Sequence, residues 1–147
     1  MPSVLACYPT IVEALAPILR QRPGAIVTID GRGGAGKTTL GRYLGWTFNV
    51  TLIETDLFLI PAQDYVIHLD DQVNRIVERR VSTPLPVIVE GIAMRQLLQR
   101  INRAADFSIY LENPRRKGSA RMQRLLVAYE AAFDPHAHAD LVTRIAS

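Results

Sequence analysis

The sequence predicts an α/β protein in which helices cover both faces of a parallel sheet. Short apolar segments alternate along the chain with longer segments of helical character. A glycine-rich stretch, residues 31–38, lies between the first of these strands and the helix that follows it. The chain has 147 residues, of which 48% are hydrophobic and 21% charged, enough for one domain with a substantial core. We therefore expect a single domain over residues 1–147, with right-handed crossovers between its strands.

The first expected elements are a helix, a strand and a second helix. A leading helix is expected over 10–21, with Pro17 as a kink or break, and a Pro-Gly turn follows it. A strand is expected over 25–30, because residues 25–29 form an apolar and β-branched run that is typical of a buried parallel strand. Apolar residues at helical spacing then predict a helix over 37–47 that begins inside the glycine-rich stretch.

The rest of the chain repeats this alternation. Short apolar runs predict the remaining strands at 50–55, 86–89, 107–111 and 141–145, and helices are expected between them at 69–81, 93–104 and 115–133. A loop extends from the second strand through Pro61. Asp70 and Asp71 favour a helix start, because negative charge is stabilised at a helix N-terminus. Pro84 and Pro86 mark the turn before the third strand.

The glycine-rich stretch is the most informative motif of the chain. It fits the phosphate-binding (Walker A) pattern G-x-x-x-x-G-K-[ST] without substitution. Glycines let backbone N–H groups approach phosphate oxygens, Lys37 supplies a charge to the terminal phosphates, and the Thr38 hydroxyl can bind magnesium. The strand before it and the helix after it favour this function over a flexible linker, because the helix dipole then points at the phosphates. The expected nucleotide-binding residues are Gly31, Arg32, Gly33, Gly34, Ala35, Gly36, Lys37, Thr38 and Thr39.

Two carboxylates follow predicted strands, at the sheet edge where ligands bind in this class of fold. Glu90 ends the third strand and is followed by Gly91, so it can hold magnesium with Thr38, directly or through water. The alternative is a solvated acid at a strand end. Asp56 follows the second strand and can accept a proton from a substrate hydroxyl. The alternative is an ordinary turn or helix-capping aspartate.

Basic residues cluster after the fourth strand, at Arg115, Arg116, Lys117, Arg121 and Arg124. Arg121 and Arg124 are three positions apart, so a helix would present them on one face. They could close over the transferred phosphate as arginine fingers supplied within the chain. A solvated basic helix face is the equally weighted alternative.

The composition of the chain limits the kinds of ligand and the cellular location that we expect. The net charge is +3 and fifteen of the 17 basic residues are arginine. They are dispersed and not interleaved with aromatic residues, so small anionic ligands explain them better than nucleic acid does. No apolar run has the length of a membrane span, and the N-terminus does not resemble a secretory signal. Cys7 is the single cysteine, which favours a cytoplasmic, reducing location. His68, His136 and His138 do not form a metal set, and we expect them at the surface.

Several segments together resemble one enzyme family. The run 29–40 resembles the opening of the uridine kinase and phosphoribulokinase-like P-loop kinases, and 55–58 resembles their aspartate-aromatic segment. Residues 87–92 are similar to their strand that ends in Glu-Gly. Tyr110-Leu111 with the arginine helix is similar to the approach to their lid, and 138–142 resembles their Ala-Asp-aliphatic segment.

The resemblance covers residues 25–145 in order. It implies a three-layer α/β/α P-loop NTPase fold with a five-stranded parallel sheet, and transfer of the γ-phosphoryl group of ATP, with Mg²⁺, to a hydroxyl. It makes Lys37 and Asp56 catalytic, with Asp56 activating the hydroxyl, and Arg121 or Arg124 lid arginines. The chain departs from the family where Leu125 follows Arg124, since an aspartate is usual there. It also has only 33 residues between Asp56 and Glu90 for binding the acceptor.

The acceptor is left open among a nucleoside, a sugar and another small alcohol such as a vitamin precursor. Two other functions remain as alternatives. One is a nucleoside monophosphate kinase, whose acceptor is a phosphate and needs no base. The other is a non-catalytic ATP-binding regulatory module, in which ATP orders residues 112–124 for a partner. The leading helix also offers a surface for a homodimer.

Overall fold

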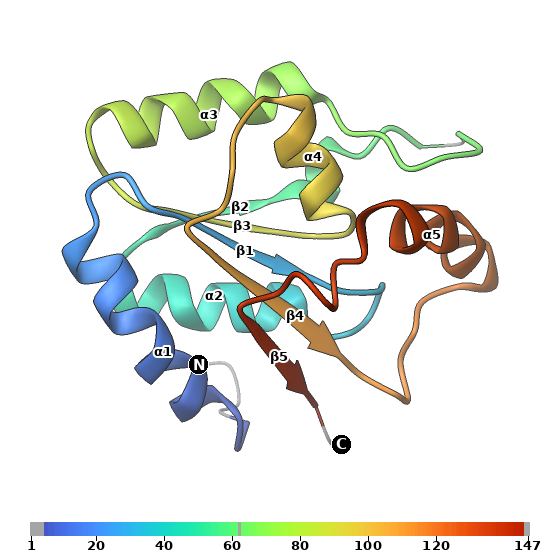
Figure 1. Cartoon of the computed structure of the whole chain (residues 1–147), viewed down its shortest axis with the longest axis horizontal. Coiled ribbons are helices and arrows are strands. Elements are labelled where there is room, and N and C mark those ends of the chain that lie inside the picture. The colour runs from blue at the N-terminus through green and yellow to red at the C-terminus, as the bar shows by residue number, and fades with distance from the viewer. Residues whose placement is uncertain (1–4, 62, 146–147) are drawn as a thin grey trace.

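The computed structural model describes residues 5–61 and 63–145, and its centre is a five-stranded sheet (Figure 1). The strands are β1 (Ile26–Asp30), β2 (Thr51–Glu54), β3 (Val87–Glu90), β4 (Phe107–Glu112) and β5 (Leu141–Arg144). They stand in the order β2-β3-β1-β4-β5, and every neighbouring pair is parallel. The predicted parallel sheet is confirmed, with the five strands at the expected positions.

Helices cover both faces of this sheet. They are α1 (Tyr8–Gln21), α2 (Lys37–Phe48), α3 (Asp70–Ser82), α4 (Met94–Arg100) and α5 (Ala120–Phe133), with a 3₁₀ helix η1 (Thr55–Phe58) after β2. In Figure 1, α1 and α2 lie on one side of the sheet and α3 and α4 on the other. The result is the expected three-layer α/β/α arrangement. Within the described residues, none of the helices is long and apolar enough to cross a membrane.

The core consists of two apolar layers, one on each face of the sheet. β1 is buried at all five positions because it is the central strand and both of its faces are covered. One layer joins β1 and β4 to α1 and α2, through Tyr8, Ile11, Leu15, Val27, Ile29, Leu40, Leu44, Ile109 and Leu111. The other joins β3 to α3 and α4, through Val73, Val77, Val87, Val89, Met94 and Leu97. The apolar face of α1 is thus used within the chain.

Three helices differ from the sequence-based expectation. α1 continues through Pro17 without a break, because its apolar face is held in the core on either side of the proline. α4 ends at Arg100 instead of 104, and Asn102 just beyond it has a left-handed backbone with φ of 57°. α5 begins at Ala120 instead of 115, because Gly118 takes a φ of +84° and Ser119 caps the helix by accepting a hydrogen bond from the Met122 N–H.

The fold brings the candidate residues to one edge of the sheet. Because the strands are parallel, their carboxyl ends meet there, with Asp30 at the end of β1 and Glu90 at the end of β3. The glycine-rich loop leaves β1 at this edge and enters α2 at Lys37. η1 follows β2 at the same edge and carries Asp56. The next segment folds back on itself, since Leu59 pairs antiparallel with His68.

Candidate active site

The loop between β1 and α2 needs glycine at specific positions. Gly31 has a φ of +153°, and a Cβ added to it would lie 2.4 Å from the carbonyl oxygen of Leu111. Gly36 has a φ of +101° and caps α2. No other residue type takes both positions without strain, since a side chain at Gly31 would displace the backbone of β4. The backbone of the loop therefore requires the glycines that the sequence pattern contains at these two positions.

The basic segment that precedes α5 lies directly on this loop. A Cβ added to Gly33 would come within 3.4 Å of the Gly118 Cα, and one added to Gly34 within 3.6 Å of the Arg116 Cβ. Arg116 and Lys117 also line a cavity of about 330 Å³ beside the loop, together with Arg32 and Tyr110. Positive charge is therefore concentrated next to the loop, as binding of a phosphorylated ligand requires.

Lys37 is held inside the loop. Its side chain is only 6% exposed, and Nζ donates a hydrogen bond of 2.6 Å to the carbonyl oxygen of Arg32. Burial lowers the pKa of Lys37. Three carboxylates act on its pKa in the opposite direction, those of Asp30, Asp56 and Glu90. The ammonium group is thus placed where the loop would hold phosphate oxygens, with carboxylates on several sides.

Thr38 and Glu90 form a pair of oxygen ligands beside Lys37. The Thr38 hydroxyl donates a hydrogen bond of 2.9 Å to Oε1 of Glu90, whose side chain is 1% exposed. Burial raises the pKa of Glu90, and the hydrogen bond from Thr38 opposes that rise. The other oxygen, Oε2, is buried and has no hydrogen-bond partner among the described residues. A buried carboxylate oxygen in this state is an incomplete site, and a cation would complete it.

These two residues fit Mg²⁺ in particular. The ion takes one or two oxygen ligands from a protein and completes its octahedron with water and phosphate oxygens. Across residues 5–61 and 63–145, no cluster of three or more His, Cys, Asp or Glu side chains suits a metal.

Thr55 and Gly91 fix the end of β3. The Thr55 hydroxyl donates a hydrogen bond of 2.8 Å to the carbonyl oxygen of Glu90. A Cβ added to Gly91 would lie 1.9 Å from that hydroxyl oxygen, and the φ of Gly91 is +152°. The Glu-Gly pair is thus required by the contact that orients Glu90.

Asp56 lies in η1, directly after β2, and its side chain is exposed. Its negative charge contributes to raising the pKa of both Lys37 and Glu90, so the three groups share one electrostatic environment. An exposed carboxylate at this position is open to a bound acceptor. Thr39, by contrast, is exposed beside Thr38 in the first turn of α2, and Ala35 is buried under the loop.

The basic residues of the segment 115–124 do not form one cluster in the structure. Arg121 donates a hydrogen bond of 2.9 Å from Nη2 to the carbonyl oxygen of Gln63. It also lines a cavity of about 240 Å³ between α5 and residues 59–61, 63, 65 and 66. Arg116 and Lys117 line the cavity beside the loop instead. Arg115 and Arg124 are exposed and line neither cavity. The structure therefore separates Arg121 from Arg124.

The structure also brings in residues that the sequence analysis did not select. Asp30 is 5% exposed and accepts hydrogen bonds from the Gly31 N–H, at 2.8 Å, and from the Tyr129 hydroxyl. Burial raises the pKa of Asp30 to about 6, against the opposing effects of the Tyr129 and Gly31 hydrogen bonds and the Lys37 charge. An aspartate directly before the motif was visible in the sequence, but its partner on α5 was not.

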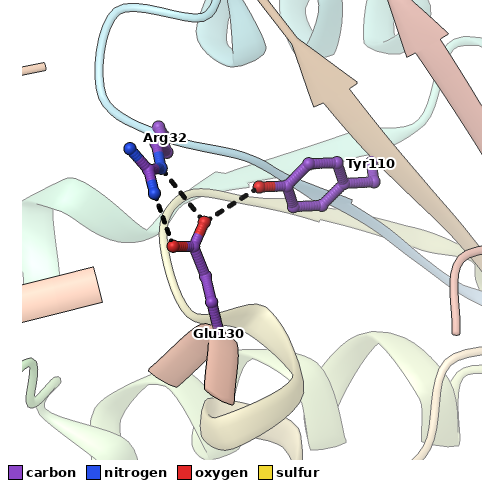
Figure 2. Close-up of polar contacts among 3 residues, drawn as sticks. All are labelled: Arg32, Tyr110 and Glu130. Carbon is purple, nitrogen blue, oxygen red and sulfur yellow. Dashed lines mark hydrogen bonds and ion pairs between the residues drawn. The ribbon is translucent and has the colours of Figure 1, made fainter. Parts of the chain in front are cut away.

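Arg32 also has a hydrogen-bond partner on α5, the residue next to Tyr129. Its Nε and Nη2 donate to Oε2 and Oε1 of Glu130 at 3.0 and 2.7 Å, and the Tyr110 hydroxyl donates to Glu130 Oε2 at 3.4 Å (Figure 2). The sequence pattern assigns no function to the side chain at this position of the loop. Nothing in the sequence connects Arg32 with a residue 98 positions away.

The histidines are placed differently from one another. His136 and His138 are exposed, as expected, and His136 Nε2 lies 3.0 Å from Glu112. His68 is buried, so the expectation of a surface position was wrong for this residue. The cause is its pairing with Leu59, which turns His68 into the interior just before α3.

Comparison with solved structures identifies the fold. The chain is similar to a possible uridine kinase from Bacillus stearothermophilus, with a TM-score of 0.69, 17% identity, and 92% of this chain and 96% of that chain covered. It is similar to an unliganded sugar kinase from Janibacter sp. HTCC2649, with a TM-score of 0.56, 16% identity and coverage of 84% and 85%. A shikimate kinase from Acinetobacter baumannii in complex with shikimate gives a TM-score of 0.51, 13% identity and coverage of 90% and 88%. Neither a protein-family profile nor a curated protein sequence matches the chain. These likenesses show that the chain shares the three-layer α/β fold of these solved structures, with its five-stranded parallel sheet, which confirms the expected fold class.

Proposed function

We propose that this chain is an ATP-dependent small-molecule kinase that transfers the γ-phosphoryl group to a hydroxyl of a nucleoside, a sugar or a similar metabolite. The observation that carries the proposal is the arrangement of Lys37, Thr38 and Glu90 around one loop, with a buried Glu90 oxygen that has no hydrogen-bond partner among the described residues. A buried carboxylate beside the loop offers a ligand for the Mg²⁺ that phosphoryl transfer requires. The fold shared with P-loop kinases supports the same conclusion.

In this proposal the loop binds the phosphates of ATP. Backbone N–H groups and the Lys37 ammonium contact the β- and γ-phosphates, and Thr38 and Glu90 hold Mg²⁺. Bound there, the ion would neutralise charge on the β- and γ-phosphate oxygens. Arg116 and Lys117 lie on the loop from the other side, and the cavity of about 330 Å³ that they line can take the rest of the nucleotide.

The chemical step assigns one function to Asp56. The oxygen of the acceptor hydroxyl forms a bond to the γ-phosphorus while the bond from that phosphorus to the β,γ-bridging oxygen breaks, and ADP leaves with the electron pair. The hydroxyl proton passes to the Asp56 carboxylate and from there to solvent. Asp56 suits this function because it is exposed at the sheet edge and shares the electrostatic environment of Lys37.

The acceptor site in this proposal lies between α5 and residues 59–61, 63, 65 and 66. The cavity of about 240 Å³ there has apolar walls and one cation, Arg121. Arg121 is therefore our candidate for the arginine that approaches the transferred phosphoryl group, and Arg124 is not.

The test is ADP release with Mg-ATP across a panel of nucleosides, sugars, pantothenate-like alcohols and nucleoside monophosphates, with Lys37→Ala as the blank. One strong alcohol acceptor is the expected result. A strong response to a nucleoside monophosphate alone would establish the monophosphate kinase instead. ATP binding with no response to any acceptor would favour the regulatory module.

A further inference from the structure

Two consecutive residues of α5 form hydrogen bonds with residues at the start of the phosphate-binding loop. Tyr129 donates a hydrogen bond to the carboxylate of Asp30, and Glu130 accepts two from the guanidinium of Arg32. Asp30 and Arg32 are the residues on either side of Gly31. The loop is thus attached at both sides of its first glycine to a helix about 100 positions away in the sequence.

The contact between Arg32 and Glu130 has the geometry of a strong ion pair. It is bidentate, at 2.7 and 3.0 Å, and both side chains are about three-quarters buried, with exposures of 29% and 25%. Bidentate pairs of this kind fix the orientation of both groups, whereas a fully exposed pair contributes little. Tyr110 on β4 donates a third hydrogen bond to Glu130, so the carboxylate is held from two directions (Figure 2).

The location of the ion pair between Arg32 and Glu130 suggests a function beyond stabilising the fold. A largely buried ion pair adds little to fold stability compared with apolar residues of similar size. Here it joins the loop that would bind phosphate to the helix that follows the basic segment, and both residues line the cavity beside the loop. Glu130 also places a negative charge in that cavity, where it opposes binding of an anion.

We propose that Glu130 is a positioning residue for nucleotide binding, which holds Arg32 so that the loop keeps the shape in which its backbone N–H groups bind phosphate. In this proposal Arg32 affects nucleotide binding by fixing the conformation of the loop backbone. Its guanidinium is hydrogen-bonded to Glu130 and does not contact the nucleotide. The inference rests on the proposed nucleotide binding at this loop, but not on any particular acceptor.

Two effects of removing the Glu130 charge have opposite signs, which makes the inference testable. If Glu130 acts only through its charge, Glu130→Gln tightens Mg-ATP binding, because a repelling carboxylate is lost. If Glu130 positions the loop, the same substitution weakens binding, because the loop loses its bidentate partner. We expect an increase of about tenfold in the dissociation constant, which corresponds to the loss of one charged, well-oriented contact.

The experiment is isothermal titration of Mg-ATP into wild type, Glu130→Gln, Arg32→Glu and the exchanged pair Arg32→Glu/Glu130→Arg. Glu78→Gln is the matched control, since Glu78 pairs with Arg103 from the second half of α3, at the far edge of the sheet. We expect Glu130→Gln and Arg32→Glu to weaken binding, the exchanged pair to recover most of the loss, and Glu78→Gln to stay within twofold of wild type. Unchanged or tighter binding by Glu130→Gln would overturn the inference.

The exchanged pair shows whether weaker binding by the single variants comes from a damaged fold. Recovery in a protein that carries two substitutions cannot come from a damaged fold. If the exchanged pair binds no better than Arg32→Glu, then Arg32 contacts the nucleotide itself and the inference is wrong. If wild type binds Mg-ATP normally and Glu130→Gln does too, only this inference fails and the kinase proposal stands. If wild type does not bind Mg-ATP, both are overturned.

Discussion

The Thr38 hydroxyl donates a hydrogen bond of 2.9 Å to one oxygen of the buried Glu90 carboxylate, and within residues 5–61 and 63–145 the second oxygen has no hydrogen-bond partner. The two residues come from different elements, the first turn of α2 and the end of β3. Parallel pairing of β1 with β3 brings them together, because both elements then face the same sheet edge. A buried carboxylate oxygen without a protein partner is commonly satisfied by ordered water or by an ion.

Replacing Glu90 tests the magnesium site. We expect Glu90→Gln to lower turnover by about 10²- to 10³-fold and to raise the Mg²⁺ concentration needed for half-maximal rate, because an amide is a weaker ligand for a hard cation. The measurement is ADP release as a function of Mg²⁺. Glu54→Gln is the matched control, since Glu54 stands opposite Glu90 in the sheet register but pairs with Arg42 at the surface. An unchanged Mg²⁺ dependence in Glu90→Gln would remove Glu90 from the site.

Replacing Asp56 tests the proton acceptor. Asp56→Asn should lower kcat by about 10²- to 10⁴-fold while the dissociation constant of Mg-ATP changes little, since the base contacts the acceptor and not the nucleotide. Steady-state kinetics together with ATP titration separate the two effects. Asp71→Asn, at another exposed aspartate, in the first turn of α3, should behave as wild type. Normal turnover in Asp56→Asn would show that another group takes the proton.

The buried Asp30 predicts a pH dependence of stability. Burial raises its pKa from 3.8 to about 6, so between these values the folded state holds a proton that the unfolded state has released. Stability from this group is complete below pH 3.8 and is lost as the pH rises through 6, a change of roughly 2–3 kcal/mol.

Urea unfolding of wild type and Asp30→Asn at pH 4.5 and pH 7.5 isolates this contribution, because other groups titrate equally in both proteins. His68 illustrates the need for the subtraction. Burial lowers the pKa of His68, so its contribution runs the other way and is lost as the pH falls through 6.5. We expect Asp30→Asn to gain stability relative to wild type at pH 7.5. Parallel pH profiles would contradict the account of Asp30.

The glycines of the loop should differ in what they tolerate. A Cβ at Gly31 meets the Leu111 carbonyl oxygen at 2.4 Å, whereas at Gly33 the nearest atom is 3.4 Å away and φ is not positive. Gly31→Ala should therefore lower the free energy of unfolding by about 1–3 kcal/mol, and Gly33→Ala should change it by less than about 0.5 kcal/mol. Chemical denaturation of the two variants measures the difference. Equal losses would mean that the loop does not have this shape.

The sheet could be predicted from the sequence because its signals are local. An unbroken apolar run predicted β1, and the glycine pattern between a strand and a helix predicted where the loop lies. The start of α5 was placed too early because the positive φ of Gly118 depends on its contact with Gly33, far away in the sequence. Pro17 was taken for a break because packing in the core, which overrides it, is not local either.

The candidate site was predictable in part for the same reason. Lys37, Thr38 and Glu90 stand at fixed places relative to strands, so parallel pairing was enough to bring them together. Tyr129 and Glu130 could not be found, since their importance comes from the way α5 lies against the loop. Arg121 and Arg124 could not be ranked, because only the contact with Gln63 distinguishes them.

The central claim is that the γ-phosphoryl group of ATP is transferred to an alcohol. A phosphorus NMR spectrum of one reaction, with enzyme, Mg-ATP and the best acceptor of the panel, tests it most directly. We expect the γ-phosphate signal to be replaced by ADP signals and a phosphate monoester signal of equal intensity, and we expect Lys37→Ala to leave the spectrum of ATP unchanged. Appearance of inorganic phosphate in place of the monoester, at the same rate with and without acceptor, would contradict it.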